Sequence, residues 1–458
     1  MNKMLRSPLF LMALTIFIDF TGFGLVIPLL PFWAEHLGAN AVGVGLILTI
    51  YALAQFIFTP ILGSLSDRYG RRPVIIASLA IEAISFALSA LANTLPFLLI
   101  ARFIGGIGAS NIGSAQAVVS DVTPPKERAR GMGLIGAAIG LGFVVGPALG
   151  GLLAPLGPAL PFWVAMGVAI ANTLLVFFFL PETRKQQEAT QPGESHRTNT
   201  FVVLAGWRQV LRNTAAARLV LINLLFTIAF TAMEAIFPLF TQHTFGWTAM
   251  QNGYIFTYVG IVIVIMQGGL VGQLVKRFGE RSLLIAGLIM LAAGLALLPW
   301  STQLALLLIA LGILSAGDGM VTPTLSALLS FASPEGAQGE ILGFAQGIAG
   351  MGRVIGPLIA GTIYALGGPG TPFLLGAGLV VLATLLAIPA LPAPHVKSPA
   401  KEESNETHIM AENLSVKYLS EACPSSVRDR DDTPSGRSAQ TSLLVVKYKH
   451  HILFPEDQ

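Results

Sequence analysis

Residues 63–72 read Gly-Ser-Leu-Ser-Asp-Arg-Tyr-Gly-Arg-Arg, and residues 272–281 read Gly-Gln-Leu-Val-Lys-Arg-Phe-Gly-Glu-Arg. The two stretches share two glycines and two arginines at the same relative positions, 209 residues apart. Glycines permit tight turns and close approach of neighbouring elements, while the charged side chains can pair across helix ends. The match indicates that the chain contains two related halves.

A second repeat supports the duplication. Glycine and proline recur through residues 133–151, at Gly133, Gly142, Gly146, Pro147, Gly150 and Gly151. Five of these positions return 210 residues later, at Gly343, Gly352, Gly356, Pro357 and Gly361. Glycines four residues apart form a flat helix face for close packing, and a proline removes one backbone hydrogen bond and permits a bend.

The composition places the chain in a membrane. Hydrophobic residues make up 53% of the 458 residues and charged residues only 11%, against roughly 25% charged in soluble domains. Twelve apolar stretches are long enough to cross about 30 Å of hydrocarbon as helices. They lie near residues 8–33, 43–64, 73–92, 96–119, 129–153, 160–181, 216–240, 250–273, 282–299, 303–330, 340–366 and 371–391. The sequence therefore predicts an all-α polytopic membrane protein with twelve transmembrane helices, as two six-helix pseudo-symmetric halves.

The distribution of Lys and Arg predicts the orientation. Basic residues occur in four of the five even-numbered loops, beginning with residues 68–72, and the odd-numbered loops contain none. This bias predicts that the basic loops and both termini are cytoplasmic in an inner (plasma) membrane. The expected units are an N-terminal bundle (1–181), a cytoplasmic linker (182–215), a C-terminal bundle (216–391) and a polar, disordered cytoplasmic tail (392–458). Two copies of an even number of helices share one orientation, which suits a substrate site between them.

Several functional classes are disfavoured. No basic stretch is interleaved with aromatic residues on a polar fold, so nucleic-acid binding is not expected despite the net charge of +3. The single cysteine, Cys423, excludes an intrachain disulfide or a multi-thiolate metal site. No nucleophile–base or metal-ligand cluster is visible, so we expect no enzyme activity, no metal and no cofactor. The expected partners are a small-molecule substrate, protons and membrane lipids, and the expected state is a monomer.

The ten residues 63–72 closely resemble the loop signature of the major facilitator superfamily. In that family the loop latches the cytoplasmic side of the two halves, so the resemblance implies this role for Asp67 and Arg71. The second copy reverses the order of acid and base, as Lys276 and Glu280. An ordinary basic loop is the alternative. The predicted gating residues are Gly63, Asp67, Arg68, Gly70, Arg71, Arg72 and Asp121.

The stretch 133–151 resembles the antiporter motif of the exporter branches of the superfamily, at every glycine and at Pro147. The resemblance implies export by exchange. Generic helix packing is the alternative, and it is physically part of the same statement.

The first apolar stretch carries an acid, Asp19, within residues 18–31, which resemble the first helix of the tetracycline/proton antiporters and related drug exporters. The likeness extends over about residues 8–391. Two departures stand out: the third-helix acid of that branch aligns with Ser85, with Glu82 one turn earlier on the same face, and no acid occupies the ninth span. These departures leave a proton mechanism intact and leave tetracycline itself open as the substrate.

Arg102 lies well inside the fourth span, where a permanent charge is costly without a partner or water. Its position resembles the fourth-helix arginine motif that the family associates with proton transfer. The equivalent residue of the second half is Leu311, so the function of Arg102 is performed once. The alternative is a structural ion pair. We predict that Asp19, Glu82 and Arg102 handle protons.

Further polar residues interrupt the spans of both halves. A carboxyl group in a low-dielectric site tends to be neutral, and water or a nearby arginine restores its charge, so alternating access can turn protonation into a conformational bias. Glu234, Asp318 and Arg353 are the predicted cavity groups of the second half. The remaining cavity candidates, each of which could instead join helices, are Gln55, Asn111, Gln116, Gln267 and Gln346.

These features predict proton-coupled efflux of a small lipophilic compound, such as tetracycline or another drug, by alternating access. Two alternatives share the fold: a lipid or glycolipid flippase, and a proton-coupled symporter. A non-transporting membrane sensor or enzyme is the alternative from another class, and substrate flux in liposomes would separate it from a transporter.

Overall fold

The computed structural model describes residues 7–124, 127–183, 213–333 and 338–388, apart from the side chains of residues 128–130 and 338–340. Regular structure in these ranges is entirely helical. Among the described residues, eleven helices are long and apolar enough to cross a membrane, and one shorter apolar helix, Thr371–Ala387, follows them. The predicted twelve-helix fold is confirmed. Most of the predicted linker and the whole predicted tail lie outside the described residues.

The first six spans, here called the first half, begin at α1. Their elements are α1 (Pro8–Val26), α2 (Leu30–His36), α3 (Ala41–Tyr69), α4 (Arg71–Ala90), α5 (Leu95–Gly108), η1 (Ala109–Asn111), α6 (Ile112–Val122), α7 (Arg128–Leu153), η3 (Ala154–Leu156) and α8 (Leu160–Phe179). Local chemistry explains the boundaries. The Asn40 side chain accepts a hydrogen bond from the Gly43 N–H at the start of α3. Gly70, at φ +106°, separates α3 from α4.

The last six spans, here called the second half, begin at α10. Their elements are α10 (Thr214–Phe245), α11 (Ala249–Ile265), η4 (Met266–Leu270), α12 (Val271–Phe278), α13 (Glu280–Leu297), η5 (Leu298–Trp300), α14 (Leu304–Phe331), α15 (Gln338–Gly367) and α16 (Thr371–Ala387). Gly279, at φ +78°, repeats the role of Gly70 between α12 and α13. All described helices belong to one compact unit.

Two of the predicted spans are interrupted. The first, expected over residues 8–33, divides into α1 and α2, because Pro28 and Pro31 lack the N–H groups that would continue the helical hydrogen bonding. The fourth, expected over residues 96–119, contains the short 3₁₀ segment η1 between α5 and α6. Both spans are therefore less regular than their hydropathy suggests.

The eighth span contains a π-helical turn, η4. Its first-half counterpart, α3, is one continuous helix of 29 residues, whereas the span Ala249–Phe278 has 30. The repeat shows where the extra residue enters: Gly253 follows Gly45 by 208 residues, but Gly272 follows Gly63 by 209. A single inserted residue is accommodated as a π-turn, which widens the helix locally. Gln267 lies on this turn and is exposed.

The repeated glycines bring equivalent helices together in each half. In the first half α1 packs on α7, and a Cβ atom at Gly146 would lie 2.7 Å from the Thr21 carbonyl oxygen. In the second half α10 packs on α15, and a Cβ atom at Gly356 would lie 2.8 Å from the Ile228 carbonyl oxygen. These glycines are therefore required for close helix packing.

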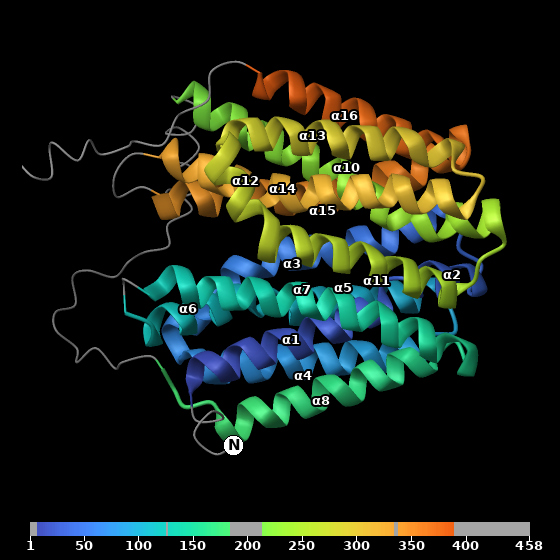
Figure 1. The fold of residues 1–458 in the computed structure, drawn as a ribbon. Helices are drawn as coiled ribbons and strands as arrows, with labels where there is room; N and C mark the ends of the chain where they lie inside the picture. The colour runs from blue at the N-terminus through green and yellow to red at the C-terminus, as the bar shows by residue number, and fades with distance from the viewer. Residues whose placement is uncertain (1–6, 125–126, 184–212, 334–337, 389–458) are drawn as a thin grey trace, which may run out of the picture. The chain divides into compact units, whose positions relative to one another are not determined.

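The two halves contact each other through α3 with α15 and through α7 with α11. We call the end of the bundle where α3 and α12 finish the motif end, and the opposite end, where α2 lies, the far end (Figure 1). The contacts between halves belong to the parts of these helices nearer the far end. Gly151 packs on the Met250 carbonyl, Gly361 packs on the Ala41 carbonyl, and the Thr49 hydroxyl donates to the Val354 carbonyl at 3.0 Å. The halves are joined there backbone to backbone.

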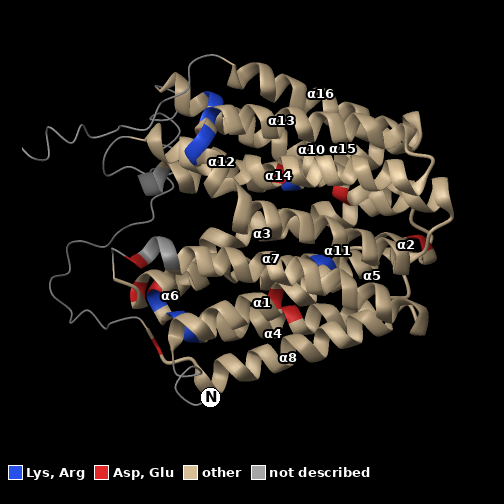
Figure 2. Cartoon of the chain, viewed as in Figure 1, with Lys and Arg blue, Asp and Glu red and all other residues tan. Residues whose placement is uncertain are grey.

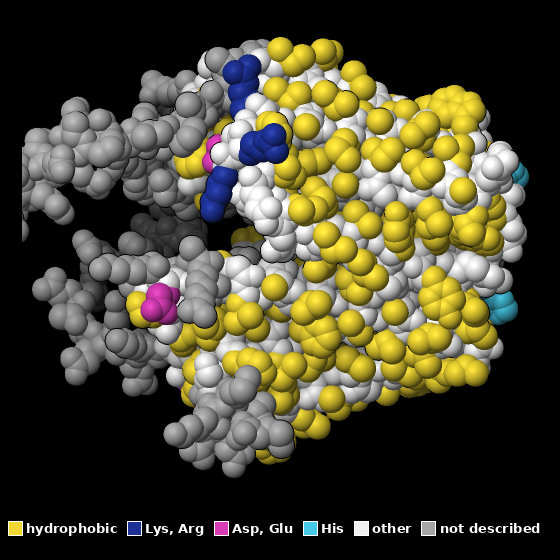
Figure 3. Space-filling model, in the orientation of Figure 1, with side chains coloured by type: hydrophobic (Ala, Val, Ile, Leu, Met, Phe, Trp, Pro, Cys, Tyr) yellow, Lys and Arg dark blue, Asp and Glu magenta, His cyan; other side chains and the backbone are white. Residues whose placement is uncertain are grey.

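The same four helices separate toward the motif end. A Cβ atom placed on eight glycines of these spans in this region would meet nothing within 4 Å, whereas one at Gly131 would lie 2.9 Å from the Val119 side chain of the same half; the eight are Gly63, Gly133, Gly136, Gly268, Gly269, Gly272, Gly343 and Gly347. Figure 3 shows a recess between the helices at this end and hydrophobic side chains over the visible flank. The exposed flank residues include Phe178 on α8 and Leu385 on α16, as expected for surfaces that face lipid. The described state is open at the motif end and closed at the far end.

The glycine packing predicts a stability difference within α7. Gly146→Ala should lower the free energy of unfolding of the purified protein by about 1–3 kcal/mol, because the added methyl group overpacks the contact with α1. Gly133→Ala is the matched control, since its Cβ meets open space and alanine favours helix. Thermal unfolding in detergent measures both. Equal melting temperatures for the two variants would contradict the packing account.

Candidate functional site

Two carboxyl groups meet inside the first half. Asp19 of α1 lies within hydrogen-bonding reach of Glu82 on α4 and of Asn111 at the end of η1. Glu82 is only 3% exposed, and its Oε2 atom has no hydrogen-bond partner in the described chain. Two ionised carboxylates at this separation repel each other, whereas one proton allows them to share a hydrogen bond. The arrangement can hold a proton between two helices.

Close packing of α5 on α4 places the pair. A Cβ atom at Gly108 would lie 2.7 Å from the Glu82 backbone nitrogen, so only glycine permits this approach. The helix then changes to the 3₁₀ segment η1, which brings Asn111 to Asp19. The sequence predicted Asp19 and Glu82 as proton-handling residues without pairing them, and it placed Asn111 only among the cavity candidates.

Arg102 is 3% exposed and lies beside this pair. Its Nη2 atom donates to the Ser89 hydroxyl at 2.8 Å and to the Ser85 hydroxyl at 3.3 Å, while its Nε has no partner among the described residues. The guanidinium carbon lies 5.7 Å from the Phe86 ring centroid and 6.0 Å from that of Tyr51. Arg102 is therefore held by hydroxyls and ring faces. Glu82 interacts with it electrostatically but forms no direct ion pair with it.

Sequence reasoning passed over three of these supporting residues. Ser85, the position aligned with the family's third-helix acid, donates to the Ala101 carbonyl at 2.7 Å and accepts from Arg102. Ser89 lies one turn further along the same face, so the helical spacing of Glu82, Ser85 and Ser89 was an available signal. Tyr51 carried no comparable signal, because its importance arises from α3 crossing α5.

The second half contains a second charged group. Asp318 of α14 is 7% exposed, Glu234 of α10 is half-buried, and Arg353 of α15 is exposed. Glu234 is the charged neighbour of both Arg353 and Asp318. Figure 2 shows acidic and basic residues within the helix interiors of both halves. The structure therefore brings the three predicted residues into one electrostatic group.

The predicted glutamines occupy different environments. Gln55 donates from Nε2 to the Ala109 carbonyl at 3.1 Å and so joins α3 to η1. Gln116 on α6, Gln267 on η4 and Gln346 on α15 are exposed. Gln55 thus has an interhelical hydrogen bond, while the other three remain cavity candidates.

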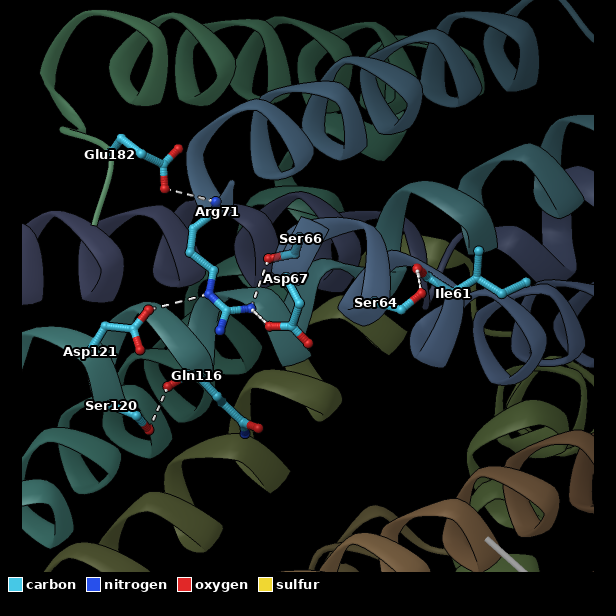
Figure 4. A network of polar contacts seen from close by, with 9 residues as sticks. All are labelled: Ile61, Ser64, Ser66, Asp67, Arg71, Gln116, Ser120, Asp121 and Glu182. Atoms are coloured by element: carbon cyan, nitrogen blue, oxygen red, sulfur yellow. Dashed lines mark hydrogen bonds and ion pairs between the residues drawn. The ribbon is translucent and has the colours of Figure 1, made fainter. Parts of the chain in front are cut away.

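The predicted gating loop forms a network around Arg71 (Figure 4). Its Nη1 lies 2.6 Å from Asp67 and 3.1 Å from the Ser66 hydroxyl, and its Nε donates to Asp121 at 3.2 Å. The backbone N–H groups of Arg71 and Arg72 both donate to Glu182, at 2.9 and 3.2 Å. These contacts join α3, α4, α6 and the segment after α8, all within the first half.

The last arginine of each loop has the same role. Arg72 donates to the Phe177 carbonyl near the end of α8, and Arg281 donates to the Ile388 carbonyl just after α16. In both halves this interaction satisfies a carbonyl that the helix terminus leaves without a partner. It fixes each loop to the sixth span of its own half.

At the far end a further acid links the halves. Glu35 of α2 is half-buried and accepts a hydrogen bond from Gln242 of α10, and it acts electrostatically on Tyr364 of α15. Burial raises the pKa of Glu35 above its ordinary value of 4.5, and the Gln242 hydrogen bond opposes this effect only in part. Glu35 therefore holds a proton more tightly while the far end is closed than it would in water.

A family model described as Major Facilitator Superfamily matches residues 12–272 and 268–445. The chain is 33% identical over 383 residues to "Tetracycline resistance protein, class C" of Escherichia coli, which covers 82% of this chain and 94% of that protein. The chain belongs to the major facilitator superfamily.

Two further comparisons agree with this assignment. "Multidrug resistance protein 2" of Bacillus subtilis (strain 168) is 31% identical over 388 residues, covering 83% of this chain and 94% of that protein. The crystal structure of the human organic anion transporter MFSD10 (TETRAN) superposes with a TM-score of 0.65 at 28% identity, covering 84% of this chain and 99% of that one. Superfamily membership and fold imply a multi-pass inner-membrane transporter with a small-molecule substrate and a lipid environment.

The burial of Glu35 predicts that closure of the far end depends on pH. Because burial in the closed state raises the pKa of Glu35, closure takes up a proton: it is favoured below the raised pKa and weakened as pH rises through it. In a Cys423→Ser background, the labelling rate of a Thr49→Cys thiol by a water-soluble maleimide reports opening of the far end. The ratio of this rate with Glu35 to that in Glu35→Gln should fall as pH falls. A ratio independent of pH would contradict the interpretation.

Proposed function

We propose that this chain is a proton-coupled antiporter that exports a small lipophilic compound, such as tetracycline or another drug, by alternating access. The single observation that carries the proposal is the Asp19–Glu82 pair, two carboxyls within hydrogen-bonding reach with a buried oxygen that no described residue satisfies. One proton on the pair replaces the repulsion between two carboxylates with a shared hydrogen bond. The proposal that drugs are exported is supported by the likeness to proteins named as tetracycline and multidrug resistance proteins.

The proposed orientation places the motif end in the cytoplasm. Apart from those within the helix interiors, the described Lys and Arg residues gather at that end (Figure 2), in accordance with the positive-inside rule. Both termini are then cytoplasmic, and the described state is open to the cytoplasm. The packed glycines of α3, α7, α11 and α15 close the periplasmic side. Rocking of the two halves about these contacts would expose the site to the other side.

Coupling follows from the position of the charges. An unprotonated acid pair is costly among apolar helices, so the state that hydrates it is favoured when the proton leaves, and protonation favours the other. Asp19, Glu82 and Arg102 perform this function in the first half. Glu234, Asp318 and Arg353 of the second half line the proposed cavity, together with the exposed Gln267 and Gln346 of the same half and Gln116 of the first half. Substrate and proton then shift the equilibrium between the two alternating-access states in opposite directions.

The remaining proposals concern organisation. Six-helix bundles at residues 1–181 and 216–391, joined by the linker 182–215, form the moving halves. Because one chain carries both charged groups, the monomer is the transporting unit. The Arg71 network and the antiporter glycines control closure of the motif end and the far end, and no enzymatic step is involved.

Transport in proteoliposomes tests the proposal. With an imposed pH gradient, the protein should move tetracycline or a lipophilic cation from a panel that also contains lysolipids. Asp19→Asn and Arg102→Ala should each reduce gradient-driven flux by about tenfold or more, the size of an ordinary coupling free energy. Glu127→Gln, which removes an exposed carboxyl at the motif end, is the matched control. Unchanged gradient-driven flux in both site variants would refute proton handling, and flux of lysolipid alone would favour a flippase.

A further inference from the structure

Two buried hydroxyls lie one helical turn from the acid pair, on its motif side. Thr15 precedes Asp19 by four residues on α1, and Ser78 precedes Glu82 by four residues on α4. Residues four apart share one face of a helix, so each hydroxyl lies on the face that carries the acid. Both helices run from the motif end toward the far end (Figure 1). The hydroxyls therefore lie between the pair and the motif end.

Two further helices of the first half reach the same level. Ser114 follows Asn111 by three residues, and α6 runs from η1 toward the motif end, so this serine also lies one turn beyond the acid site. On α8, the Nδ2 atom of Asn172 donates to the Thr15 carbonyl at 3.0 Å, which places the amide group beside Thr15. Helices α1, α4, α6 and α8 therefore each carry a short polar side chain at one level of the bundle.

These side chains are buried and lack hydrogen bonds. All four are at most 2% exposed. The hydroxyls of Thr15, Ser78 and Ser114 have no hydrogen-bond partner among the described residues. Oδ1 of Asn172 and Oε2 of Glu82 also lack one in that part of the chain. We call these five atoms the unpaired layer. Because a buried polar atom without a hydrogen bond is costly, the layer requires a partner that the surrounding side chains do not supply.

The helix backbone does not satisfy these hydroxyls either. Serine and threonine within a helix can donate to the carbonyl four residues earlier. Thr21 and Thr173 do this in the same half, at 2.7 and 2.8 Å. The three hydroxyls of the unpaired layer form no such bond. They are therefore available to a molecule that lies between the helices.

Apolar packing limits what that molecule can be. One further turn toward the motif end, four side chains that are at most 1% exposed belong to one hydrophobic cluster; they are Leu11 of α1, Ile75 of α4, Val118 of α6 and Val176 of α8. They separate the layer from the motif end, so its occupant is small and enclosed. Water fits this description, because it donates and accepts hydrogen bonds and commonly satisfies buried polar groups that lack a protein partner.

We propose that the unpaired layer binds about two water molecules, which solvate Glu82 from inside the first half. The number follows from about three hydrogen bonds for each buried water and five atoms to satisfy. A water that donates to Glu82 Oε2 stabilises the ionised carboxylate without exposing it to the substrate cavity. The layer thus sets how readily the acid pair releases its proton. The proposal rests on the proton-coupled function described above and adds the groups that solvate its proton site.

The counterpart helix of the second half does not share these groups. At the spacing of 209 residues that relates α4 to α13, Ser78 corresponds to Gly287. At the same spacing Glu82 corresponds to Leu291. The packing of this helix therefore needs neither polar group, and the serine occurs in the copy that carries the acid.

Isotope-edited infrared spectroscopy of the purified full-length protein tests the site. Spectra are compared at acidic and alkaline pH, in ordinary water and in water labelled with heavy oxygen. As the protonated-carboxyl band of the parent disappears, an O–H stretching band that shifts in labelled water should change, because the bound waters alter their hydrogen bonds when Glu82 ionises. Thr15→Val and Ser78→Ala should each weaken or shift this water band. They should also let the carboxyl band persist to higher pH, since the carboxylate loses solvation.

Thr173→Val is the matched control, because it removes a hydroxyl that already bonds its own helix, and it should behave like the parent. If the carboxyl band titrates but no band responds to heavy oxygen, the layer is dry, while the proposed function stands. A water band that neither substitution alters would place the water elsewhere. Loss of the carboxyl band in both variants would show that the hydroxyls support the fold and do not bind water. If the parent has no titrating carboxyl band, proton coupling fails and the solvating role fails with it.

Discussion

The cost of an unsatisfied charge inside a membrane is the constraint on which the structure depends. Glu82 is almost completely buried among apolar helices and Asp19 is half-buried beside it, so an ionised pair is costly there. Two stable solutions exist: a proton on the pair, or a conformation that hydrates it. A protein that switches between these solutions converts a proton gradient into movement, so the other features are understood by how they permit that movement.

The helix packing is symmetric between the halves, but the charged groups within the halves are not. Equivalent glycines join α1 to α7 and α10 to α15 within the halves, and Gly151 and Gly361 join the halves at the far end. Backbone contacts of this kind are flat and contain few interlocked side chains, which suits helices that slide or rock. Arg102, in contrast, has no counterpart, because Leu311 occupies the equivalent position of the second half. The glycine contacts are therefore duplicated, whereas the proposed proton site belongs to the first half alone.

The membrane spans, the repeat and most polar site residues could be predicted, because hydropathy and glycine spacing are local properties of the sequence. The breaks at η1 and η4 could not be located from hydropathy, since an apolar stretch looks the same whether its helix is regular or carries one extra residue. The roles of Ser85, Tyr51 and Glu182 depend on which helices cross, and this information is tertiary. The loop resemblance predicted a latch between halves, whereas the Arg71 contacts of the described state lie within the first half; how that loop acts when the motif end closes remains part of the proposal.

Infrared difference spectroscopy of the purified protein tests the central claim most directly, because the C=O stretch of a protonated carboxyl is separate from that of a carboxylate. At neutral pH we expect a buried protonated-carboxyl band that disappears on alkaline titration and that both Asp19→Asn and Glu82→Gln remove or shift, since the two residues share one proton. If no such band is present, or if it is unaffected by both substitutions, the pair is permanently ionised and cannot drive exchange.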